Sequence, residues 1–313
     1  MYREGFSLYN ANEASQPEKK RDARFEKQEI LEKQKILMSK MACQINESVE
    51  QYGMKPLVNL DGRIRIENFA LENGGIYDDE VIATDGGLVH TAHRSNSGSF
   101  ERATQDRYRK QYGIETEEGI LAHYKEEREM SASNQAEVVI TALLHKVLRE
   151  RFLVVRASEF DDYLNGIDNL ILDKETGALI CAFDEVVENI SDAGKDSKKI
   201  LKMQAKAEQG GAEAKYGVML QDDGTLARAD IKHIPVFYLN LKSTDLKDLT
   251  ESLADHFEGE VSPLERGIFT NLVDSIREQK ALLESVHLPK NMRRKLSEFT
   301  PSLDILRDFC EKK

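Results

Sequence analysis

Residues 163–190 limit the fold most strongly, because two apolar runs there are separated by a short turn. The runs "IDNLIL" and "ALICAFDEVV" flank the turn "DKETG". Gly177 can adopt the positive φ that closes a hairpin, so this pattern predicts two adjacent antiparallel strands. The strands also carry acidic residues, with Asp168 in the first run and Asp184 and Glu185 in the second. Acidic side chains within apolar strands need a physical explanation.

A shared cation is one such explanation. Residue alternation puts Asp184 and Glu185 on opposite faces of the second strand, and a hairpin register can bring Asp168 beside Asp184. Two neighbouring carboxylates repel, and keeping both ionised is costly unless a cation lies between them. Oxygen ligands of this kind suit Mg²⁺ or Mn²⁺. The alternative is that Asp168 caps a strand entry and that Asp184 and Glu185 lie at a solvated strand end.

Helix and strand patterns alternate on both sides of this hairpin. "NQAEVVITALLHKVLRERF" has apolar residues at helical spacing, and Ser133 or Asn134 can cap its start. "FLVVRAS" predicts a strand before the hairpin. "DSKKILKMQAKAEQ" predicts a helix ended by Gly210 and Gly211, and "YGVML" and "IPVFYLNLK" predict two more strands. The predicted order is helix, three strands, helix, two strands.

The N-terminal region is predicted to be helical with a small β element. Residues 17–52 are rich in charge and have a heptad of large side chains at Leu31, Met38, Ile45 and Tyr52. This pattern predicts a long amphipathic helix that packs on its own domain or forms a short coiled coil. Two hairpin signals follow in residues 57–100, at Asp61-Gly62 and at Asp85-Gly86-Gly87.

The C-terminal region, from Ser243 onward, has helical periodicity, and Pro263, Pro289 and Pro301 divide it into segments. The whole pattern predicts an α+β protein with three parts. These are an N-terminal helical region with a small β element at 1–130, a mixed central sheet flanked by helices at 131–242, and a helical C-terminal region at 243–313.

The order of elements and the positions of the acids resemble the core of the PD-(D/E)XK nuclease superfamily. The resemblance covers residues 133–242, about 110 of 313 residues, and its motifs are short. It implies a mixed central sheet flanked by helices in the restriction-endonuclease-like manner. In that superfamily an Asp on one strand and an Asp/Glu-x-Lys on the next bind Mg²⁺ and position a water for attack on a phosphodiester.

The resemblance also implies roles for four acidic residues. Asp168 matches the first motif aspartate and Asp184 matches the acid of the second motif, so both are expected to bind Mg²⁺ or Mn²⁺. Glu185 stands beside Asp184 and is a further candidate ligand. Glu137 matches a glutamate that the superfamily often supplies from the preceding helix, where it would support the metal or the water.

The motif lysine is absent from this chain. Its position is Val186 when counted from Asp184, or Val187 when counted from Glu185. Helical spacing places four lysines of the next helix on a single face: Lys195, Lys199, Lys202 and Lys206. If this face overlooks the metal site, Lys199 or Lys202 can replace the missing lysine and stabilise charge on the attacked phosphate. If the face is solvated, the lysines form a surface stripe.

The sequence therefore predicts a Mg²⁺-dependent nuclease that hydrolyses phosphodiester bonds of DNA. The alternative is an inactive protein with a nuclease fold that acts as an adaptor for nucleic acid or protein. A third possibility is an assembly protein that forms a homo-oligomer, or binds a partner protein, through the N-terminal helix.

Charge, apolar runs and cysteine positions limit the kinds of binding partner and the cellular compartment that we expect. The net charge is −12 and 32% of residues are charged, which argues against wrapping nucleic acid with a uniformly basic surface. No apolar run approaches the roughly 20 residues that span a bilayer, and the first residues lack the layout of a signal peptide. The three cysteines are far apart and are expected to be reduced thiols. We expect a cytoplasmic protein that binds no membrane.

Overall fold

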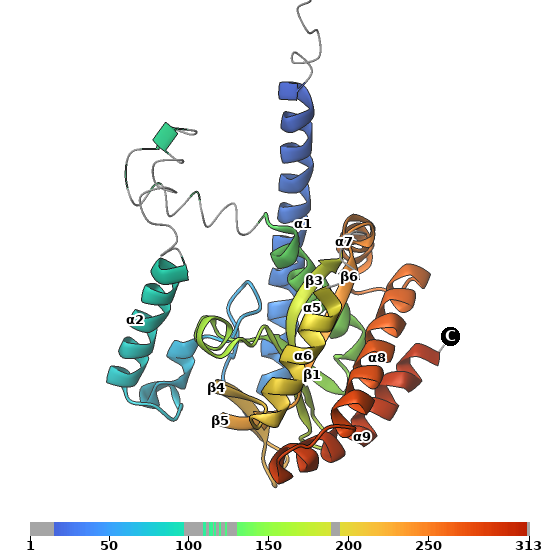
Figure 1. Cartoon of the computed structure of the whole chain (residues 1–313). Helices are drawn as coiled ribbons and strands as arrows, with labels where there is room; N and C mark the ends of the chain where they lie inside the picture. Colours follow the sequence, from blue (N-terminus) through green and yellow to red (C-terminus); the bar gives the residue numbers. More distant parts are fainter. Residues whose placement is uncertain are drawn as a thin grey trace, which may run out of the picture.

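A computed structural model describes the backbone of residues 16–96, 130–188 and 195–311, with isolated residues between 109 and 123. Side chains are described for residues 28–89, 130–180 and 199–310 and for some of the isolated residues. The centre of the molecule is a four-stranded mixed sheet packed against helices from both ends of the chain (Figure 1). The fold class is α+β, as the sequence predicts.

The central sheet contains the predicted hairpin. Its strands, in spatial order, are β1 (Phe152–Arg156), β2 (Asn169–Asp173), β3 (Leu179–Glu188) and β6 (Val236–Lys242). β2 is antiparallel to both β1 and β3, whereas β6 is parallel to β3. Asn169 faces Ala182 across the hairpin, and Gly177 has a φ of 69° in the turn. The hairpin and its turn are therefore confirmed.

One irregularity interrupts the pairing of β3 with β6. Phe183 faces Tyr238 and Val186 faces Asn240, so three steps along β3 correspond to two steps along β6. This is a β-bulge, which adds one residue to β3 and changes the face on which later residues lie. The bulge coincides with the predicted acidic pair at Asp184 and Glu185. Residue alternation therefore cannot be counted through this part of the strand.

Helices precede and follow the hairpin as predicted. α5 (Ala132–Leu148) comes first and α6 (Lys195–Glu208) comes after β3. The predicted caps of α5 at Ser133 and Asn134 are wrong, because the Ser131 hydroxyl accepts the hydrogen bond from the Asn134 backbone N–H. α6 ends before Gly210 and Gly211, both with positive φ, as predicted.

A second sheet follows α6 and holds a strand that the sequence analysis missed. β4 (Ala212–Leu220) and β5 (Leu226–Ile234) form an antiparallel hairpin. The sequence "LARADIKHI" of β5 mixes apolar and charged residues, and only three of its nine residues are buried. Because it is not an apolar run, the strand gives little signal. The order is therefore helix, three strands, helix, three strands.

The N-terminal helix α1 (Gln16–Gln51) packs along α5 and α7 (Asp245–His256). Leu31, Met38 and Ile45 of the predicted heptad are buried, and Tyr52 packs against the core just after the helix. This confirms the long helix and shows that its described part packs on its own protein. Figure 1 shows α1 running through the molecule and extending beyond it at its N-terminal end.

The second predicted hairpin, at Asp85-Gly86-Gly87, is wrong because this segment lies in helix α2 (Asp79–Asn96). Asp85 is buried and binds side chains of β4, and these tertiary contacts hold the segment in a helix despite its two glycines. The first signal, Asp61-Gly62, is a turn, and the expected β element is reduced to isolated bridges: Val58 with Ile64, Arg63 with Arg156 of β1, and Ala70 with Tyr77. Two short 3₁₀ turns follow it, η1 (Ile66–Phe69) and η2 (Leu71–Asn73).

The C-terminal region contains α7, α8 (Pro263–Glu284) and α9 (Lys290–Glu311). Pro263 occupies the first turn of α8 and Pro289 precedes α9, as predicted. Pro301 lies inside α9 and does not end it, so the predicted break there is wrong. Buried residues of α9 lie on both sides of Pro301, at Leu296, Phe299, Leu303 and Leu306. Their packing offsets the roughly 3 kcal/mol that an internal proline costs a helix.

The buried apolar residues form one continuous core that draws on all three predicted regions. A buried ion pair crosses it, because Lys146 of α5 contacts Glu265 of α8 at 2.8 Å with both side chains almost fully buried. Gln34 of α1 also hydrogen-bonds the Thr250 hydroxyl of α7. The predicted boundaries at 130 and 242 thus mark changes of sequence pattern within a shared core.

Candidate functional site

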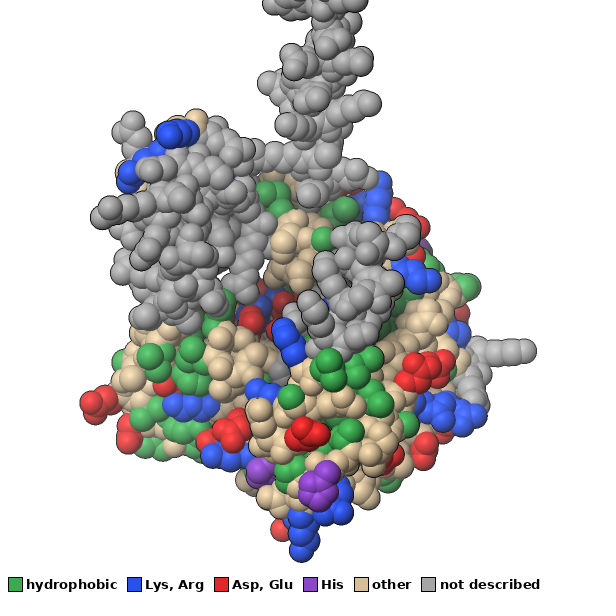
Figure 2. Space-filling view, viewed as in Figure 1, with side chains coloured by type: hydrophobic (Ala, Val, Ile, Leu, Met, Phe, Trp, Pro, Cys, Tyr) green, Lys and Arg blue, Asp and Glu red, His purple; other side chains and the backbone are tan. Residues whose placement is uncertain are grey.

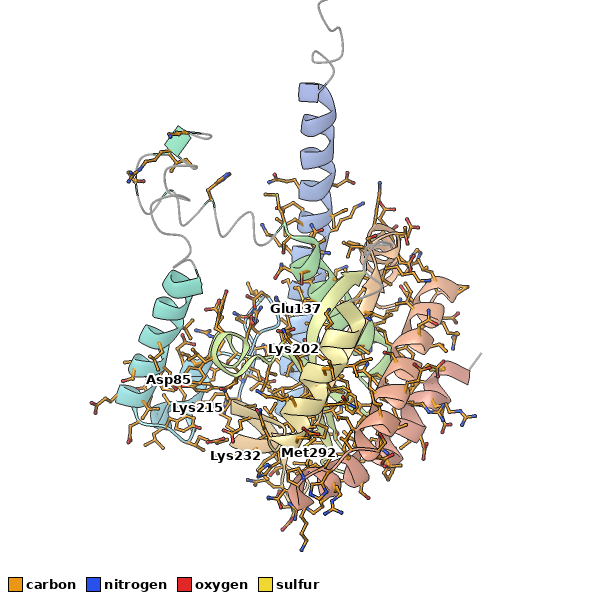
Figure 3. All side chains as sticks on the ribbon, in the orientation of Figure 1. Asp85, Glu137, Lys202, Lys215, Lys232 and Met292 are labelled. Atoms are coloured by element: carbon orange, nitrogen blue, oxygen red, sulfur yellow. The ribbon has the colours of Figure 1, made fainter. Side chains whose placement is uncertain are left out.

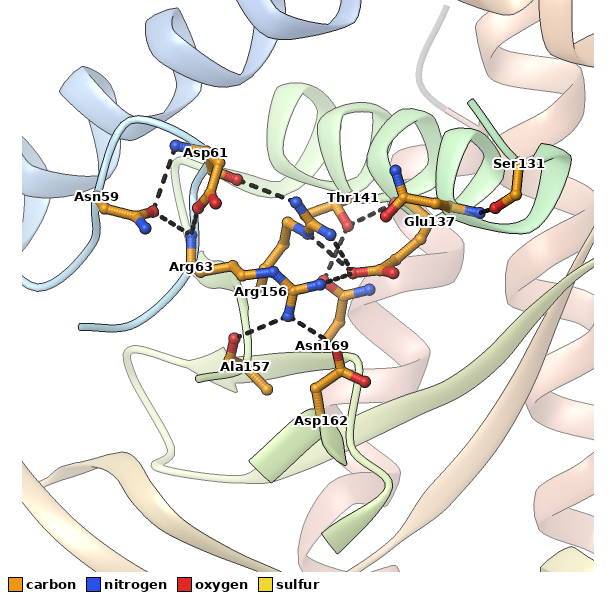
Figure 4. A network of polar contacts seen from close by, with 11 residues as sticks. Asn59, Asp61, Arg63, Ser131, Glu137, Thr141, Arg156, Ala157, Asp162 and Asn169 are labelled. Atoms are coloured by element: carbon orange, nitrogen blue, oxygen red, sulfur yellow. Dashed lines mark hydrogen bonds and ion pairs between the residues drawn. The ribbon is translucent and has the colours of Figure 1, made fainter. Parts of the chain in front are cut away.

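Glu137 of α5 lies in a network with two arginines (Figure 4). Its Oε1 atom accepts hydrogen bonds from Nε and Nη2 of Arg156, at 2.8 and 2.6 Å, and from Nη2 of Arg63 at 3.3 Å. The side chains of Arg63 and Arg156 are 9% and 5% exposed, and that of Glu137 is 12% exposed. The network is therefore a nearly buried cluster of charges.

Other acceptors complete the arginine contacts. Asp162 binds Nη1 of Arg63 at 3.0 Å. Arg63 also donates to the backbone oxygen of Ala157, and Arg156 donates to that of Asp61. Burial alone would lower the pKa of Arg63, but the negative charges of Glu137 and Asp162 outweigh it and hold the pKa above its usual value. Carboxylates therefore pair with both guanidinium groups in the network.

Three parts of the chain bring this network together. Glu137 is one turn into α5, and the Thr141 hydroxyl, one turn later, donates to the Glu137 carbonyl oxygen at 2.7 Å and lies 2.8 Å from Asn169 Oδ1 of β2. Arg156 is the last residue of the buried strand β1. Arg63 directly follows Gly62, whose φ of 76° allows the tight turn after α1. Neither arginine is predicted from the sequence pattern, although a charge at the end of "FLVVR" is a detectable signal.

Asp168 lies one residue before β2. Its carbonyl oxygen accepts a hydrogen bond from the Ala157 backbone N–H at 2.8 Å, which places it beside the end of β1, next to Arg156. The side chain of Asp168 is half-buried. Continuing the register of Asn169 with Ala182 brings Asp168 opposite Phe183, the residue before Asp184. On this register Asp168 shares a face with Phe183, so residue alternation alone does not put Asp184 beside it, and the Asp184 side chain lies outside the described residues.

The two predicted lysines of α6 differ in their environments. Nζ of Lys199 lies 5.7 Å from the centre of the Tyr238 ring on β6, and the side chain is half-buried. Tyr238 pairs with Phe183, so Lys199 lies at the level of the acidic pair in β3. Lys202 is exposed on α6 and is labelled in Figure 3. The predicted single face is therefore divided, and Lys199 alone of these two is directed toward the sheet.

The predicted metal ligands fit a divalent cation unequally. Among the side chains that the structure describes, no group of three or more His, Cys, Asp or Glu residues is arranged to hold a metal ion. Glu137 fits poorly as a ligand, because the two guanidinium groups on its carboxylate would repel a cation. The side chains of Asp184 and Glu185 lie outside the described residues, so a ligand set of Asp168 with these two remains a prediction.

A second buried polar cluster joins α2 to β4. The Tyr216 hydroxyl donates to Oδ2 of Asp85 at 2.6 Å, and Lys215 forms an ion pair with the same carboxylate. Figure 3 labels Asp85 and Lys215 side by side. The Lys215 ammonium lies 5.0 Å from the Phe160 ring centre and 5.2 Å from that of Tyr77. Each of these groups is held by partners inside the protein, so the cluster attaches α2 to the core.

Asp161 has a similar structural role at the start of the π-helical turn η4 (Asp161–Asn165). Its carboxylate accepts hydrogen bonds from the backbone N–H groups of Lys215 and Tyr216 and from the side chains of Ser158 and Asn165. Burial raises the pKa of Asp161, although each of these four hydrogen bonds opposes the rise. The local bonds to Ser158 and Asn165 agree with the turn role that its position before Asn-Gly suggests.

A cavity of about 440 Å³ lies beside the arginine network, between α1 and α5. Arg63 and Arg156 form part of its wall, together with residues of α1, α5 and η4. Its size falls within the range of roughly 300–1,000 Å³ that is usual for small-molecule sites. We call it the α1–α5 cavity.

The outer surface shows no dominant charge in the view of Figure 2. Basic and acidic side chains are interspersed over the described part of this face. A surface of this kind steers a polyanion weakly, so recognition of nucleic acid would depend on a local site. None of the helices that the structure describes has the length and apolarity needed to cross a membrane.

Comparisons of the chain with protein-family models, with curated proteins and with solved structures each found no match.

Proposed function

We propose that this protein is a metal-dependent nuclease that hydrolyses phosphodiester bonds of DNA, with Mg²⁺ or Mn²⁺ as its cofactor. The order α5, β1, β2, β3, α6 and then β6, with β6 parallel to β3, supports a restriction-endonuclease-like core. In that arrangement Asp168, directly before β2, and the acids of β3 would share one region of the hairpin. The observation that carries the proposal is the position of Lys199 beside Tyr238, at the level of the bulge in β3, with Asp168 directly before the paired strand β2.

Each residue would have a distinct task. Asp168, with Asp184 and Glu185, would hold the cation through carboxylate oxygens. A bound divalent ion would supply a water of lowered pKa and polarise the phosphoryl oxygen. Lys199 would stabilise negative charge that develops on the attacked phosphate, which is the task of the missing motif lysine. Glu137 would not contact the metal ion. It would hold the side chains of Arg63 and Arg156 in position beside the site.

Two observations favour a second candidate, an inactive protein with this fold that binds nucleic acid or protein. Val186 and Val187 occupy the positions expected for the motif lysine. In addition, the carboxylate of Glu137 is bound by arginines. Both features would be expected if the chain had lost nuclease activity and had kept the nuclease fold to bind nucleic acid or protein.

Cleavage assays test the first proposal. Purified protein is incubated with plasmid, linear duplex and single-stranded DNA, with Mg²⁺ or Mn²⁺, and compared with Asp168→Asn. The control is Asp248→Asn, an exposed acid of α7. Cleavage that is lost in Asp168→Asn and kept in Asp248→Asn supports the nuclease. Absence of cleavage, or cleavage that survives Asp168→Asn, excludes it, and DNA binding that chelator does not change then favours the adaptor.

We also propose that the protein acts in the cytoplasm and that α1 contacts a second copy or a partner protein. A DNA nuclease of this kind would act in the cytoplasm, and Cys43 and Cys310, which form no disulfide within the described residues, fit a reducing compartment. The N-terminal end of α1 would be the contact for a second copy or a partner protein. Light scattering of the full chain and of a chain that begins at residue 28 tests that contact.

A further inference from the structure

A second cavity, of about 320 Å³, opens between the C-terminal end of α1 and the turn of the β2–β3 hairpin. Its volume is near the lower end of the range that is usual for small-molecule sites. Polar parts of its wall come from Gln44 and Ser48 of α1, Arg149 at the end of α5 and Lys174 of the hairpin turn. Asp168 and Lys174 flank β2 at opposite ends, so this cavity is separate from the proposed nuclease site. We call it the Lys174 pocket.

Lys174 is a buried cation without an acidic partner. The residue is 8% exposed and forms no ion pair with any acid that the structure describes. Its Nζ atom donates to the Arg149 backbone oxygen at 2.9 Å and to the Ser48 hydroxyl at 3.4 Å, and lies 5.5 Å from the centre of the Tyr52 ring. An ammonium has three N–H donors, so one of them has no acceptor in the described part of the chain.

The burial of this cation is costly. Burial lowers the pKa of Lys174, and the negative charge of Glu150 opposes that shift only in part. Lysine is almost never fully buried unless it is paired, because an isolated charge loses its hydration inside the protein. An anion in the pocket would supply the missing pair.

The guanidinium group of Arg149 also has donors that are not used. Nη1 donates to Gln44 Oε1 at 2.9 Å, and Nε lies 3.9 Å from a carboxylate oxygen of Glu150, which is beyond hydrogen-bond distance. Nη2 has no acceptor among the residues that the structure describes. The side chain is 32% exposed, so a ligand can reach it. Nε and Nη2 together form the edge through which arginine binds two oxygens of a phosphate or carboxylate.

The pocket also has two acids, but these are more exposed than the cations. Glu47 is exposed on α1, and the side chain of Glu150 is 85% exposed. Water and salt screen exposed charges more than buried ones, so the cations dominate the potential inside the pocket. His145, which also lines the pocket, lies in this positive potential. Burial lowers the pKa of His145, and the charges of Arg149 and Lys174 lower it further.

A phosphate monoester has the chemistry that these groups require. It carries between one and two negative charges near neutral pH and has three oxygens that accept hydrogen bonds, so a single group can bind both cations. We propose that the Lys174 pocket binds the phosphate group of a small phosphorylated metabolite, with Arg149 and Lys174 as the charged donors. The Ser48 hydroxyl would donate a further hydrogen bond, and the rest of the volume would hold a small polar skeleton such as a sugar. This binding needs no metal ion and does not depend on the proposed nuclease function.

Calorimetric titration in a phosphate-free buffer with chelator tests the site. The probes are ribose 5-phosphate, inorganic phosphate and ribose, at an ionic strength matched with sodium chloride. We expect ribose 5-phosphate to bind, and ribose, which lacks the phosphate, to bind at least about tenfold more weakly. Inorganic phosphate should compete for the same site and bind more weakly than ribose 5-phosphate. Equal or tighter binding of inorganic phosphate would overturn the metabolite and assign the pocket to free phosphate.

Four variants separate the pocket from general charge effects. Arg149→Met and Lys174→Met each remove one cation and should weaken binding of ribose 5-phosphate at least about tenfold. Lys55→Met removes an exposed lysine outside the pocket and should leave binding unchanged. Glu47→Gln removes an exposed acid of the pocket, so binding should be as tight as in the unmodified protein or tighter. Because Arg149 is partly exposed, Arg149→Met keeps the test decisive if Lys174→Met fails to fold.

The inference is overturned if ribose 5-phosphate does not bind, if ribose binds equally well, or if folded Arg149→Met binds like the unmodified protein. Loss of binding in Glu47→Gln would also contradict it. These outcomes are independent of the nuclease proposal. Binding of ribose 5-phosphate by a protein that cleaves no DNA would keep this site and remove the nuclease, whereas cleavage that depends on Asp168, without such binding, would keep the nuclease and remove this site.

Discussion

Arg156 donates two hydrogen bonds to the carboxylate of Glu137, from Nε at 2.8 Å and from Nη2 at 2.6 Å. These bonds connect the end of β1 to the first turns of α5. Both nitrogens meet the same oxygen atom. A nearly buried pair of this kind holds a helix and a strand in a fixed relation, because neither charge can be solvated elsewhere. The pair also sets the position of the α1–α5 cavity relative to Asp168.

Replacing Arg156 with Met should destabilise the protein by about 3 kcal/mol, because removing one partner of a buried pair leaves the other charge poorly compensated. Arg63 would still pair with Glu137, so the loss of folding stability should lie near the lower end of the range of about 3–5 kcal/mol that is usual for a broken buried ion pair. The measurement is urea unfolding followed by circular dichroism. Arg65→Met, which alters an exposed pair with Glu67, should change stability by less than about 0.5 kcal/mol. Equal effects of the two variants would contradict the structural role of Arg156.

Replacing Lys199 with Met should reduce the rate of DNA cleavage at least about 100-fold if the nuclease proposal holds, since one lost charge-stabilising donor typically costs about 10²–10³ in rate. Lys202→Met is the matched control on the same helix and should cleave at the unmodified rate. The measurement is the single-turnover rate with saturating Mg²⁺. A larger loss in Lys202→Met than in Lys199→Met would show that the wrong lysine has been assigned.

His145 should make stability fall as the pH is lowered. Its ring is buried on α5, stacks on Phe257 and has Nε2 3.1 Å from Gln44 Oε1. Burial, together with the charges of Arg149 and Lys174, lowers the pKa of His145 to about 3. The unfolded chain therefore takes up a proton near its ordinary pKa of 6.5 while the folded chain does not. Stability contributed by the neutral ring is complete above that pH and is lost progressively down to about pH 3.

Between pH 6.5 and pH 5 this effect should cost about 2 kcal/mol, at about 1.4 kcal/mol for each pH unit. The measurement is urea unfolding across that range. His145→Gln should remove this part of the slope whatever its stability at neutral pH, and the exposed His287→Gln should keep it. An unchanged slope in His145→Gln would contradict the assignment.

The buried pair of Lys146 and Glu265 should behave as a unit. Nζ of Lys146 also donates to the His256 backbone oxygen at 2.7 Å, and Glu265 accepts from Ser252 and from the backbone of Ser262. Lys146→Met alone should cost about 3–5 kcal/mol, because Glu265 would remain charged and buried. Adding Glu265→Leu should recover part of this loss, and unfolding of the two single variants and the double variant measures the coupling. Additive effects of the two changes would mean that the pair is not coupled.

The parts of the fold that the sequence predicts are those with strong local patterns. The hairpin around Gly177, the helix α6 with its glycine end and the long helix α1 all follow from periodicity and turn chemistry. The errors arise where tertiary contacts override local preference. Asp85-Gly86-Gly87 has the composition of a turn, but the buried contacts of Asp85 with Tyr216 and Lys215 keep it helical.

In the candidate site, too, some features follow from local sequence patterns and others depend on tertiary contacts. The approach of Asp168 to the second strand follows from hairpin register, whereas helical spacing predicts a single lysine face on α6, and only one of the two candidate lysines is directed toward the sheet. Which lysine it is depends on the angle at which α6 packs, and spacing alone cannot specify that angle. The arginine network depends on Arg63, 74 residues before Glu137, and a contact over that separation leaves no trace in a local pattern.

The hydrogen bond between Gln34 and Thr250 has a consequence for how the protein is made. These residues are 216 positions apart in the chain. A ribosome adding about 5–20 residues per second takes about 10–40 s to cover that interval. During this time α1 has left the ribosome, but its partner α7 has not yet been synthesised. The apolar face of α1, including Leu37 and Met41, therefore stays exposed to solvent. The newly made chain is therefore expected to need a chaperone during those seconds, or to protect this helix temporarily against α5.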